Sequence, residues 1–404
     1  MITKIFEILP QERATPLQYF GIFRIFVQTW QAKCASKSNF FLMAKKNLKG
    51  LTLESLEQFI VSIGEPKYRA AQIYQWLYKY RVTTFDEMTN LSVPLRQKLN
   101  ETASIEQFSV ATFQTSKVDG TVKFLYELSD GKKIETVLIP PRPTAVDAEE
   151  RMTLCISTQI GCALDCTFCA TASMGFLRNL TTGEILNQYI TAQSFSEKPI
   201  TNIVFMGMGE PMLNYDNVMS AVDIITDQNG IGLSPKRITL STAGYANHIR
   251  KMADEDRKIK LALSLHSLRD NVRKELMPVT KKFDVEQLIS ALEYYNRKTK
   301  KSVMLEYIVF DGINDTDEDV QLLVKAARRL DCRINLIPFH SIEFTNPQGT
   351  SAKLVGASKE GLERFWQKLR SHDVITFIRH SAGVDIDAAC GQLAVKEEQT
   401  IMNH

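Results

Sequence analysis

Several features that would identify a protein class at once are scarce in this sequence. Its 404 residues carry a net charge of only +3, so overall charge gives no reason to expect a nucleic-acid partner. Seven cysteines are too few for a scaffold built on disulfides. The apolar run at residues 19–30 is too short to span a bilayer and contains Arg24, and no secretory signal is recognisable. We therefore expect a cytoplasmic protein without membrane attachment, whose thiols stay reduced unless chemistry oxidises them.

Residues 43–105 have the pattern of a small helical domain, preceded by an extension over residues 1–42 whose role the sequence does not reveal. Apolar residues recur at helical spacing from Leu53 to Ile63. The stretch 67–81 then combines four cations with five aromatic side chains and no acid. Cations suit RNA phosphates and aromatics suit unstacked bases. A helix with a core-facing aromatic stripe and a solvated basic face would show the same pattern.

Strand character replaces helical spacing over residues 106–151. The runs 121–128 and 132–140 are joined by Ser-Asp-Gly, and an Asp-Gly turn between such runs is a strong hairpin signal. Residues 140–151 are rich in proline and charge. We therefore predict a β-hairpin followed by an exposed linker.

From residue 152 to residue 380, strand-like and helix-like segments alternate. Such alternation predicts an α/β fold with a parallel sheet, and six strands favour a partial (β/α)6 barrel with its site at the carboxyl ends of the strands. Residues 381–404 remain as a C-terminal tail. The predicted strands are 153–158, 202–207, 237–242, 259–266, 303–310 and 333–339. Helix-like segments between them include 182–195, 216–228, 284–300 and 316–330.

Three cysteines, Cys162, Cys166 and Cys169, lie within eight residues in the loop after the first of these strands. A zinc site usually closes with four ligands in two Cys-x2-Cys pairs, and the sequence has no second pair. Three thiolates can instead hold three irons of a cubane cluster and leave the fourth iron open. This spacing resembles the signature of the radical S-adenosylmethionine (SAM) superfamily. The resemblance implies a 4Fe-4S cluster on these cysteines, with SAM on the open iron.

The stretch 205–214 ends the next predicted strand. Gly207 and Gly209 suggest a dinucleotide-binding fingerprint, but that motif needs a third glycine where Met212 stands. Within the SAM superfamily this stretch is similar to the "GGEP" motif. The similarity implies that Gly209 and Glu210 contact the amino group of SAM, and a carboxylate suits an ammonium group.

Three more strand ends carry polar side chains. Ser241 ends one strand, Ser264, Leu265 and His266 end the next, and His340 follows the last. Taken singly, each hydroxyl serves local backbone capping as readily as ligand binding. Together they are expected to form the rim of the SAM pocket. Members of the superfamily commonly have Asn where His340 stands, and His retains the ability to form a hydrogen bond.

Two further cysteines complete a narrower resemblance. Cys155 lies seven residues before the first cluster cysteine, and Cys390 lies in the polar stretch 385–394. Alone, each would be taken for a core cysteine, but a polar, glycine-bearing surrounding favours a reactive thiol. With "GCALDCTFCA", "MGMGEPMLN", "LSLH" and "NLIPF", the stretch "DIDAACGQL" resembles the adenine-carbon-2 RNA methyltransferases over roughly residues 50–395.

This resemblance implies a specific activity and specific roles. The substrates would be an adenine in the peptidyl transferase centre of 23S rRNA, presented on an assembly intermediate that carries few proteins, and the adenine next to the anticodon in tRNA. Cys390 would take a methyl group from one SAM, and a second SAM would yield the 5′-deoxyadenosyl radical. Cys155 would then release the product through a transient disulfide. Glu135 matches the glutamate assigned as base; its alternative is an exposed strand residue.

The resemblance also implies partners, and the chain differs from the family pattern at one position of the tail. We expect an external electron donor such as flavodoxin, and a monomer. Family tails usually carry Arg where this chain has Ala382, which puts docking of the tail, rather than the chemistry, in question. Two alternatives remain. One is methylation of carbon 8 by a sister group with the same cysteines, and the other is a non-catalytic RNA-binding protein with a structural zinc.

Overall fold

The computed structural model describes residues 45–141 and 151–395. The predicted extension over residues 1–42, most of the predicted linker and the end of the tail lie outside the described residues. Within the described part, no helix combines the length and apolarity needed to cross a membrane.

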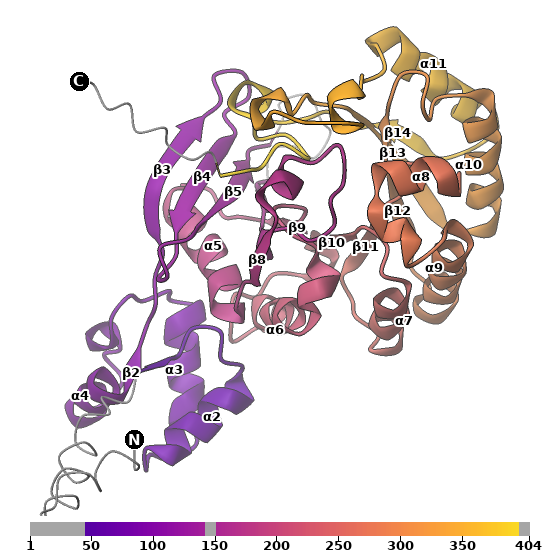
Figure 1. Ribbon diagram of the computed structural model, residues 1–404. Coiled ribbons are helices and arrows are strands. Elements are labelled where there is room, and N and C mark those ends of the chain that lie inside the picture. The colour runs from indigo at the N-terminus through magenta and orange to yellow at the C-terminus, as the bar shows by residue number, and fades with distance from the viewer. Residues whose placement is uncertain (1–44, 142–150, 396–404) are drawn as a thin grey trace, which may run out of the picture.

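The amino-terminal helices form a unit that projects away from the rest of the molecule (Figure 1). Helix α2 begins after Thr52, whose side chain accepts a hydrogen bond from the backbone N–H of Ser55. Two short strands at the ends of the unit pair in parallel and close it. Its elements are β1 Lys46–Asn47, α2 Leu53–Ser62, α3 Arg69–Tyr78, α4 Val93–Thr102 and β2 Ala103–Ser104.

Ten strands form one sheet in the order β14-β13-β12-β11-β10-β9-β6-β5-β4-β3. From β6 to β14 all neighbours are parallel, while β3, β4 and β5 form an antiparallel meander that joins through β5 and β6. The fold class is therefore the predicted α/β sheet, with the hairpin built into it. The strands are β3 Ser109–Thr115, β4 Val122–Glu127, β5 Lys133–Ile139, β6 Thr153–Cys155, β9 Asn202–Phe205, β10 Ile238–Thr242, β11 Lys260–Ser264, β12 Val303–Val309, β13 Cys332–Pro338 and β14 Thr376–Ile378.

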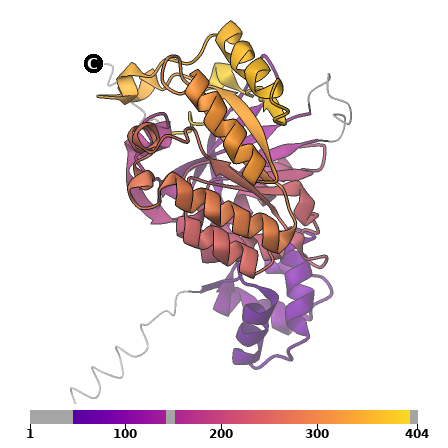
Figure 2. The ribbon, with the colours of Figure 1, turned by 90° about the vertical axis from the view of Figure 1, so that its right-hand side faces the viewer.

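Helices cover the outer face of the parallel strands (Figure 2). Capping boxes at Thr181, Asp284 and Thr316 start three of them, each satisfying two backbone N–H groups that the helix leaves unpaired. The helices are α5 Thr182–Ser194, α6 Tyr215–Thr226, α7 Ala246–Asp254, α8 Asp270–Leu276, α9 Val285–Thr299, α10 Asp317–Arg329 and α11 Lys359–Arg370. Short 3-10 turns are η1 Phe85–Glu87, η3 Ala170–Met174, η4 Pro211–Asn214, η5 Pro235–Arg237, η6 Pro278–Lys281, η7 Glu343–Thr345, η8 Ser351–Lys353 and η9 Val384–Ile386.

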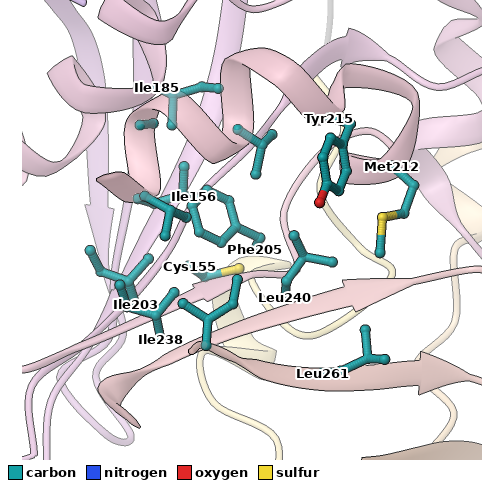
Figure 3. Packing of buried hydrophobic residues seen from close by; sticks show 14 of the residues in the cluster. Cys155, Ile156, Ile185, Ile203, Phe205, Met212, Tyr215, Ile238, Leu240 and Leu261 are labelled. Carbon is teal, nitrogen blue, oxygen red and sulfur yellow. The ribbon is translucent and has the colours of Figure 1, made fainter. Parts of the chain in front are cut away.

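The main core fills the space between the sheet and these helices. Figure 3 shows Ile203, Phe205 and Leu240 from neighbouring strands packed beside Ile185 of α5. Cys155 lies among these apolar side chains and is 8% exposed. Burial of such residues supplies most of the favourable free energy of folding, at about 25 cal/mol per Å² of apolar surface. The core therefore holds the strand ends rigidly where the site residues stand.

Candidate active site

The three clustered cysteines line one wall of a cavity at the carboxyl ends of the strands, here called the cysteine-loop cavity. Strands β7 Gln159–Gly161 and β8 Phe176–Asn179 form a ribbon at the base of the loop. Gly161 has a φ of +70°, and a Cβ there would lie 1.7 Å from the carbonyl oxygen of Gly175. Only glycine fits, because that oxygen accepts a hydrogen bond from the N–H of Cys162 at 2.9 Å.

The thiols suit a cluster better than a single metal ion. Within residues 45–141 and 151–395, no three His, Cys, Asp or Glu side chains are grouped so that they could hold a metal ion. A single zinc would need sulfurs about 3.8 Å apart, given Zn–S bonds of about 2.3 Å. A cubane instead binds each thiolate to a different iron, and the three cysteines that line this cavity supply three such ligands. Burial raises the pKa of the Cys162 thiol to about 12, so ligation must release protons. The three cysteines thus fit a 4Fe-4S cluster.

A buried arginine holds together the strand-end loops around this cavity. Arg273 is fully buried and donates hydrogen bonds to the carbonyl oxygens of Ala243, Leu265 and Ser264, at 2.6, 3.0 and 3.1 Å. Burial lowers its pKa to about 10, while the nearby thiol of Cys166 opposes the shift. Sequence reasoning missed Arg273, because nothing around it on α8 distinguishes it from a surface cation.

Glu210 and Gly209 also line this cavity. The carboxylate of Glu210 is 3% exposed and accepts hydrogen bonds from the N–H of Met212 at 3.0 Å and of Ala243 at 2.7 Å. Burial raises its pKa, and these backbone donors oppose the shift. A Cβ on Gly209, whose φ is +93°, would lie 2.4 Å from the Cβ of Gln159. The glycine therefore lets the strand end fold closely against the cysteine-loop ribbon.

The predicted rim is partly assembled. The hydroxyls of Ser241 and Ser264 lie 3.4 Å apart on the cavity wall. His266 also lines the cavity, and its Nδ1 accepts from the N–H of Ile308 at 3.0 Å. Burial lowers the pKa of His266 to about 3, followed in size by the charge of Arg273, so the neutral ring carries its proton on Nε2.

Two other predicted rim residues do not line the cysteine-loop cavity. Leu265 is fully buried, with its carbonyl oxygen engaged by Arg273. His340 is half-buried, and its Nε2 contacts the hydroxyl of Ser381 in the tail. Burial lowers the pKa of His340. The structure therefore places His340 beside the tail rather than on this cavity wall.

The C-terminal tail crosses the cysteine loop and carries Cys390 into the cavity. The N–H of Ala170 donates to the carbonyl oxygen of Gly391 at 2.7 Å, and the hydroxyl of Thr171 donates to that of Leu393 at 2.6 Å. Both donors follow Cys169 directly in sequence. The cysteine loop and the tail are thus hydrogen-bonded to each other, although Ala170 and Cys390 are 220 positions apart in the sequence.

A second cavity, here called the tail cavity, adjoins the first. Cys155, Arg151 and Thr153 line one side, and tail residues line the other. Cys390 and Arg379 line both cavities. Burial raises the pKa of Cys155 to about 12, the neighbouring Cys390 raises it further, and Arg379 opposes both. Both thiols thus line the tail cavity, and Cys390 also lines the cysteine-loop cavity.

Arg379 and Glu306 form an ion pair where the two cavities adjoin, with 3.5 Å between Nη1 and a carboxylate oxygen. Charge on Cys390 contributes most to raising the pKa of Arg379, and Glu306 adds to it against the effect of burial. Sequence reasoning missed both residues. A signal was available for Glu306, the one acid within the otherwise apolar strand β12.

Glu135 lies under the tail and lines neither cavity. It is 5% exposed, so its alternative interpretation as an exposed strand residue is wrong. Its carboxylate lies 3.3 Å from Nζ of Lys123 on the neighbouring strand, and that ammonium also donates to the carbonyl oxygen of Asp387 in the tail. The ion pair makes burial of both charges tolerable and connects the meander to the tail.

The aromatic side chains in and beside helix α3 are partly buried in the core and partly exposed on the surface. Tyr74 and Tyr78 are buried, and the hydroxyl of Tyr78 accepts from the N–H of Gly50 at 2.8 Å. Tyr68 and Tyr80, at the ends of the helix, are 59% and 56% exposed. Part of the stripe is therefore core, and part is surface that faces solvent with its cations.

Comparisons with known proteins agree with this geometry. A family model described as "Ribosomal RNA large subunit methyltransferase N-terminal domain" matches residues 46–105, and one described as "Radical SAM superfamily" matches residues 156–324. A "Probable dual-specificity RNA methyltransferase RlmN" from Flavobacterium psychrophilum is 43% identical over 357 residues, covering 87% of this chain and 99% of the relative. Its namesake from Christiangramia forsetii is 44% identical over 356 residues, covering 87% and 97%.

A solved structure is similar over most of the chain. The crystal structure of a radical SAM methyltransferase from Sphaerobacter thermophilus matches with a TM-score of 0.79 and 37% sequence identity, covering 87% of this chain and 100% of that one.

Proposed function

The chain belongs to the RlmN family of radical SAM RNA methyltransferases, and on this premise we propose that it methylates carbon 2 of an adenine in 23S rRNA and in tRNA. The observation that carries the proposal is that Cys155 and Cys390 line one cavity, while Cys390 also lines the adjoining cavity of the three-cysteine loop. The adenines would be one in the peptidyl transferase centre and one next to the anticodon.

The cysteine-loop cavity would hold the cofactors. Cys162, Cys166 and Cys169 would bind the 4Fe-4S cluster, which when bound supplies the electron that cleaves SAM to the 5′-deoxyadenosyl radical. Glu210, fixed by two backbone donors, would accept hydrogen bonds from the ammonium of SAM together with the Gly209 turn. Ser241, Ser264 and the Nε2 proton of His266 would make further contacts to SAM. Leu265 and His340, which do not line this cavity, would support its wall rather than touch SAM.

The two thiols of the tail cavity would carry the methyl group. Carbon 2 of adenine is electron-poor and so is the methyl of SAM, so direct displacement fails. Cys390 would attack the methyl of a first SAM, with the guanidinium of Arg379 lining the same two cavities. A second SAM would provide the radical that removes a hydrogen atom from the S-methyl, and the carbon radical would add to the base. The adduct radical would return one electron to the bound cluster and lose the proton of carbon 2. Cys155 would then attack the sulfur of Cys390, forming a transient disulfide, and the methylene carbon that leaves this sulfur would take up a proton to become the methyl group of the product.

Glu135 would take the proton from carbon 2. Its position beneath the tail, paired with Lys123, supports this role only with movement of the tail segment around Asp387. Such movement would open the tail cavity for a base that has left its stack. The proposal thus makes the Lys123–Glu135 pair part of the reacting assembly.

The remaining assignments are also proposals. Residues 43–105 would be an RNA-binding accessory domain, and residues 152–380 and 381–404 would be the barrel and the methyl-carrying tail. The enzyme would act in the cytoplasm as a monomer, with two SAM per turnover, electrons from a flavodoxin-like donor, and rRNA presented before assembly is complete.

The test is an anaerobic assay on ribosomal and transfer RNA fragments with SAM and a reductant, followed by mass mapping of the modified nucleoside. We expect 2-methyladenosine, together with 5′-deoxyadenosine. Formation of 8-methyladenosine instead would assign the chain to the sister reaction. Colourless protein without iron and sulfide after reconstitution would contradict the cluster.

A further inference from the structure

The inner face of the parallel sheet is cationic at the end opposite the cysteine loop. Lys260 lies four residues before Ser264 on β11, and Arg333 lies four residues before Ile337 on β13. Side chains alternate along a strand, so Lys260 and Arg333 share the face of Ser264 and Ile337, both of which line the cysteine-loop cavity. Arg151 lines the tail cavity just before β6.

A fourth cation completes this group, here called the cationic floor: Arg151, Arg237, Lys260 and Arg333. Arg237 directly precedes β10, Arg151 lies two residues before β6, and Lys260 and Arg333 lie at the starts of β11 and β13, so all four are at the amino ends of strands in one parallel sheet. The charges of Arg151, Arg333 and Arg237 add to the effect of partial burial in lowering the pKa of Lys260. All four side chains are exposed, and among the described residues none of them forms an ion pair with a carboxylate. Repulsion within such a group is relieved by a polyanion.

Strand β14 leads from this floor to the reacting thiols. Thr376 is buried and its carbonyl oxygen accepts from the indole N–H of Trp366 on α11 at 2.9 Å. The alternate positions Ile375, Phe377 and Arg379 therefore face the inner side of the sheet. Ile375 and Phe377 are 50% and 49% exposed, while Arg379 reaches both cavities. An exposed aromatic ring thus lies between the floor and the thiols of the tail cavity.

We propose that the cationic floor and Phe377 bind the RNA strand on either side of the nucleotide that enters the tail cavity. Cations contact phosphates, and an exposed ring offers a base a surface for stacking. Four residues of strand span about 13 Å, so a nucleotide extruded from a strand held on the floor reaches toward Cys390. The inference rests on the proposed function and adds a second RNA contact surface, separate from the amino-terminal helices.

The test is the salt dependence of RNA binding by the reconstituted full-length enzyme. A labelled anticodon stem-loop RNA is titrated between 50 and 200 mM salt, and affinity is followed by fluorescence anisotropy. Lys260→Gln and Arg333→Gln should each lower the slope of log affinity against log salt by about 0.7 to 0.9. The matched controls Lys325→Gln and Arg328→Gln, on the exposed side of α10, should leave the slope unchanged.

Phe377→Ala should weaken binding by about tenfold without changing the slope, since stacking of one base is worth about 1–3 kcal/mol. Thermal midpoints confirm that each variant folds. If the wild type binds and methylates the RNA while floor variants keep the wild-type slope, the floor assignment is wrong and the proposed function stands. If the wild type neither binds nor methylates any RNA fragment, the proposed function fails, and this inference fails with it.

Discussion

The two adjoining cavities share Arg379 and Cys390 but are built in opposite ways. The cysteine-loop cavity is made of strand-end loops whose geometry is locally determined, such as the Gly161 turn and the Glu210 cap. The tail cavity is made of Cys155 on β6 and of a tail that hydrogen bonds hold in place. The difference separates two tasks. Under the proposed function, residues of the first cavity would hold the cluster and SAM, and those of the second would transfer the carbon and resolve the adduct.

The largest effect is expected from removing one of the three clustered cysteines of the cysteine-loop cavity. Cys166→Ala should abolish iron binding, deoxyadenosine release and RNA methylation together, because two thiolates cannot hold the cluster. Iron analysis and anaerobic turnover measure this. Cys332→Ala is the matched control, since Cys332 is buried on β13 away from both cavities. Normal iron content in Cys166→Ala would contradict the assignment.

Removing a thiol of the second cavity should separate the two tasks. Cys155→Ala should still release deoxyadenosine but should trap RNA covalently on Cys390, visible as a slowly migrating band. Cys390→Ala should give neither methylated protein nor methylated RNA. Free methylated RNA from Cys155→Ala at the wild-type rate would show that Cys155 does not resolve the adduct.

A smaller effect is expected at the shared wall. Arg379→Met should slow resolution by Cys155 about tenfold, because the arginine lowers the pKa of the Cys155 thiol. Arg379 holds the pKa of Cys155 below the value that burial alone would give, so the variant's resolution step should shift to higher pH. Rescue by Arg379→Lys, with its charge retained, distinguishes this role from packing. An unchanged pH profile would remove Arg379 from the chemistry.

The smallest effect concerns the anchoring of the tail. Asp119 accepts from the N–H of Gly383 at 2.9 Å and from the N–H of Thr121 at 3.0 Å. Burial raises the pKa of Asp119, but the hydrogen bonds outweigh this effect, so the pKa is lowered overall. The carboxylate therefore favours the docked tail above its ordinary pKa, and this contribution is lost as pH falls through the lowered value. Asp119→Asn should reduce RNA methylation a few-fold, and hydrogen exchange at Gly383 should rise.

Deoxyadenosine release in Asp119→Asn should stay near the wild-type level, because the anchor contacts only the tail and the meander. Equal loss of both products would show that the tail also supports the first cavity. Ser116→Ala offers a milder comparison, since its hydroxyl donates to Asp385 in the same tail at 2.7 Å.

The sequence predicts the cysteine-loop cavity better than it predicts the tail cavity. The cysteine loop, Glu210 and the alternation of strands and helices were predictable because each is a contiguous motif or a regular period. Strand β3 lies in the region of predicted strand character, but its bounds were not predicted because its side chains are almost all exposed and show no alternation. Strand β14 was missed because it has three residues. Arg379 gains its role only from packing against Glu306 on another strand.

Glu135 shows both what the local sequence predicts and what it does not. Its sequence neighbours predict a strand, which is confirmed, but they do not reveal that Lys123 buries it. Local sequence thus determines which element a residue joins. The partner that decides its burial and charge comes from elsewhere in the chain.

The most direct test of the central claim uses SAM whose methyl group carries three deuteriums. Enzyme first freed of any methyl on Cys390 is given this SAM, reductant and RNA, and products are analysed by mass spectrometry. The account predicts two deuteriums in the methyl group of 2-methyladenosine and one in 5′-deoxyadenosine, because the radical removes a hydrogen atom from the S-methyl of Cys390. A product methyl that retains all three deuteriums would contradict it.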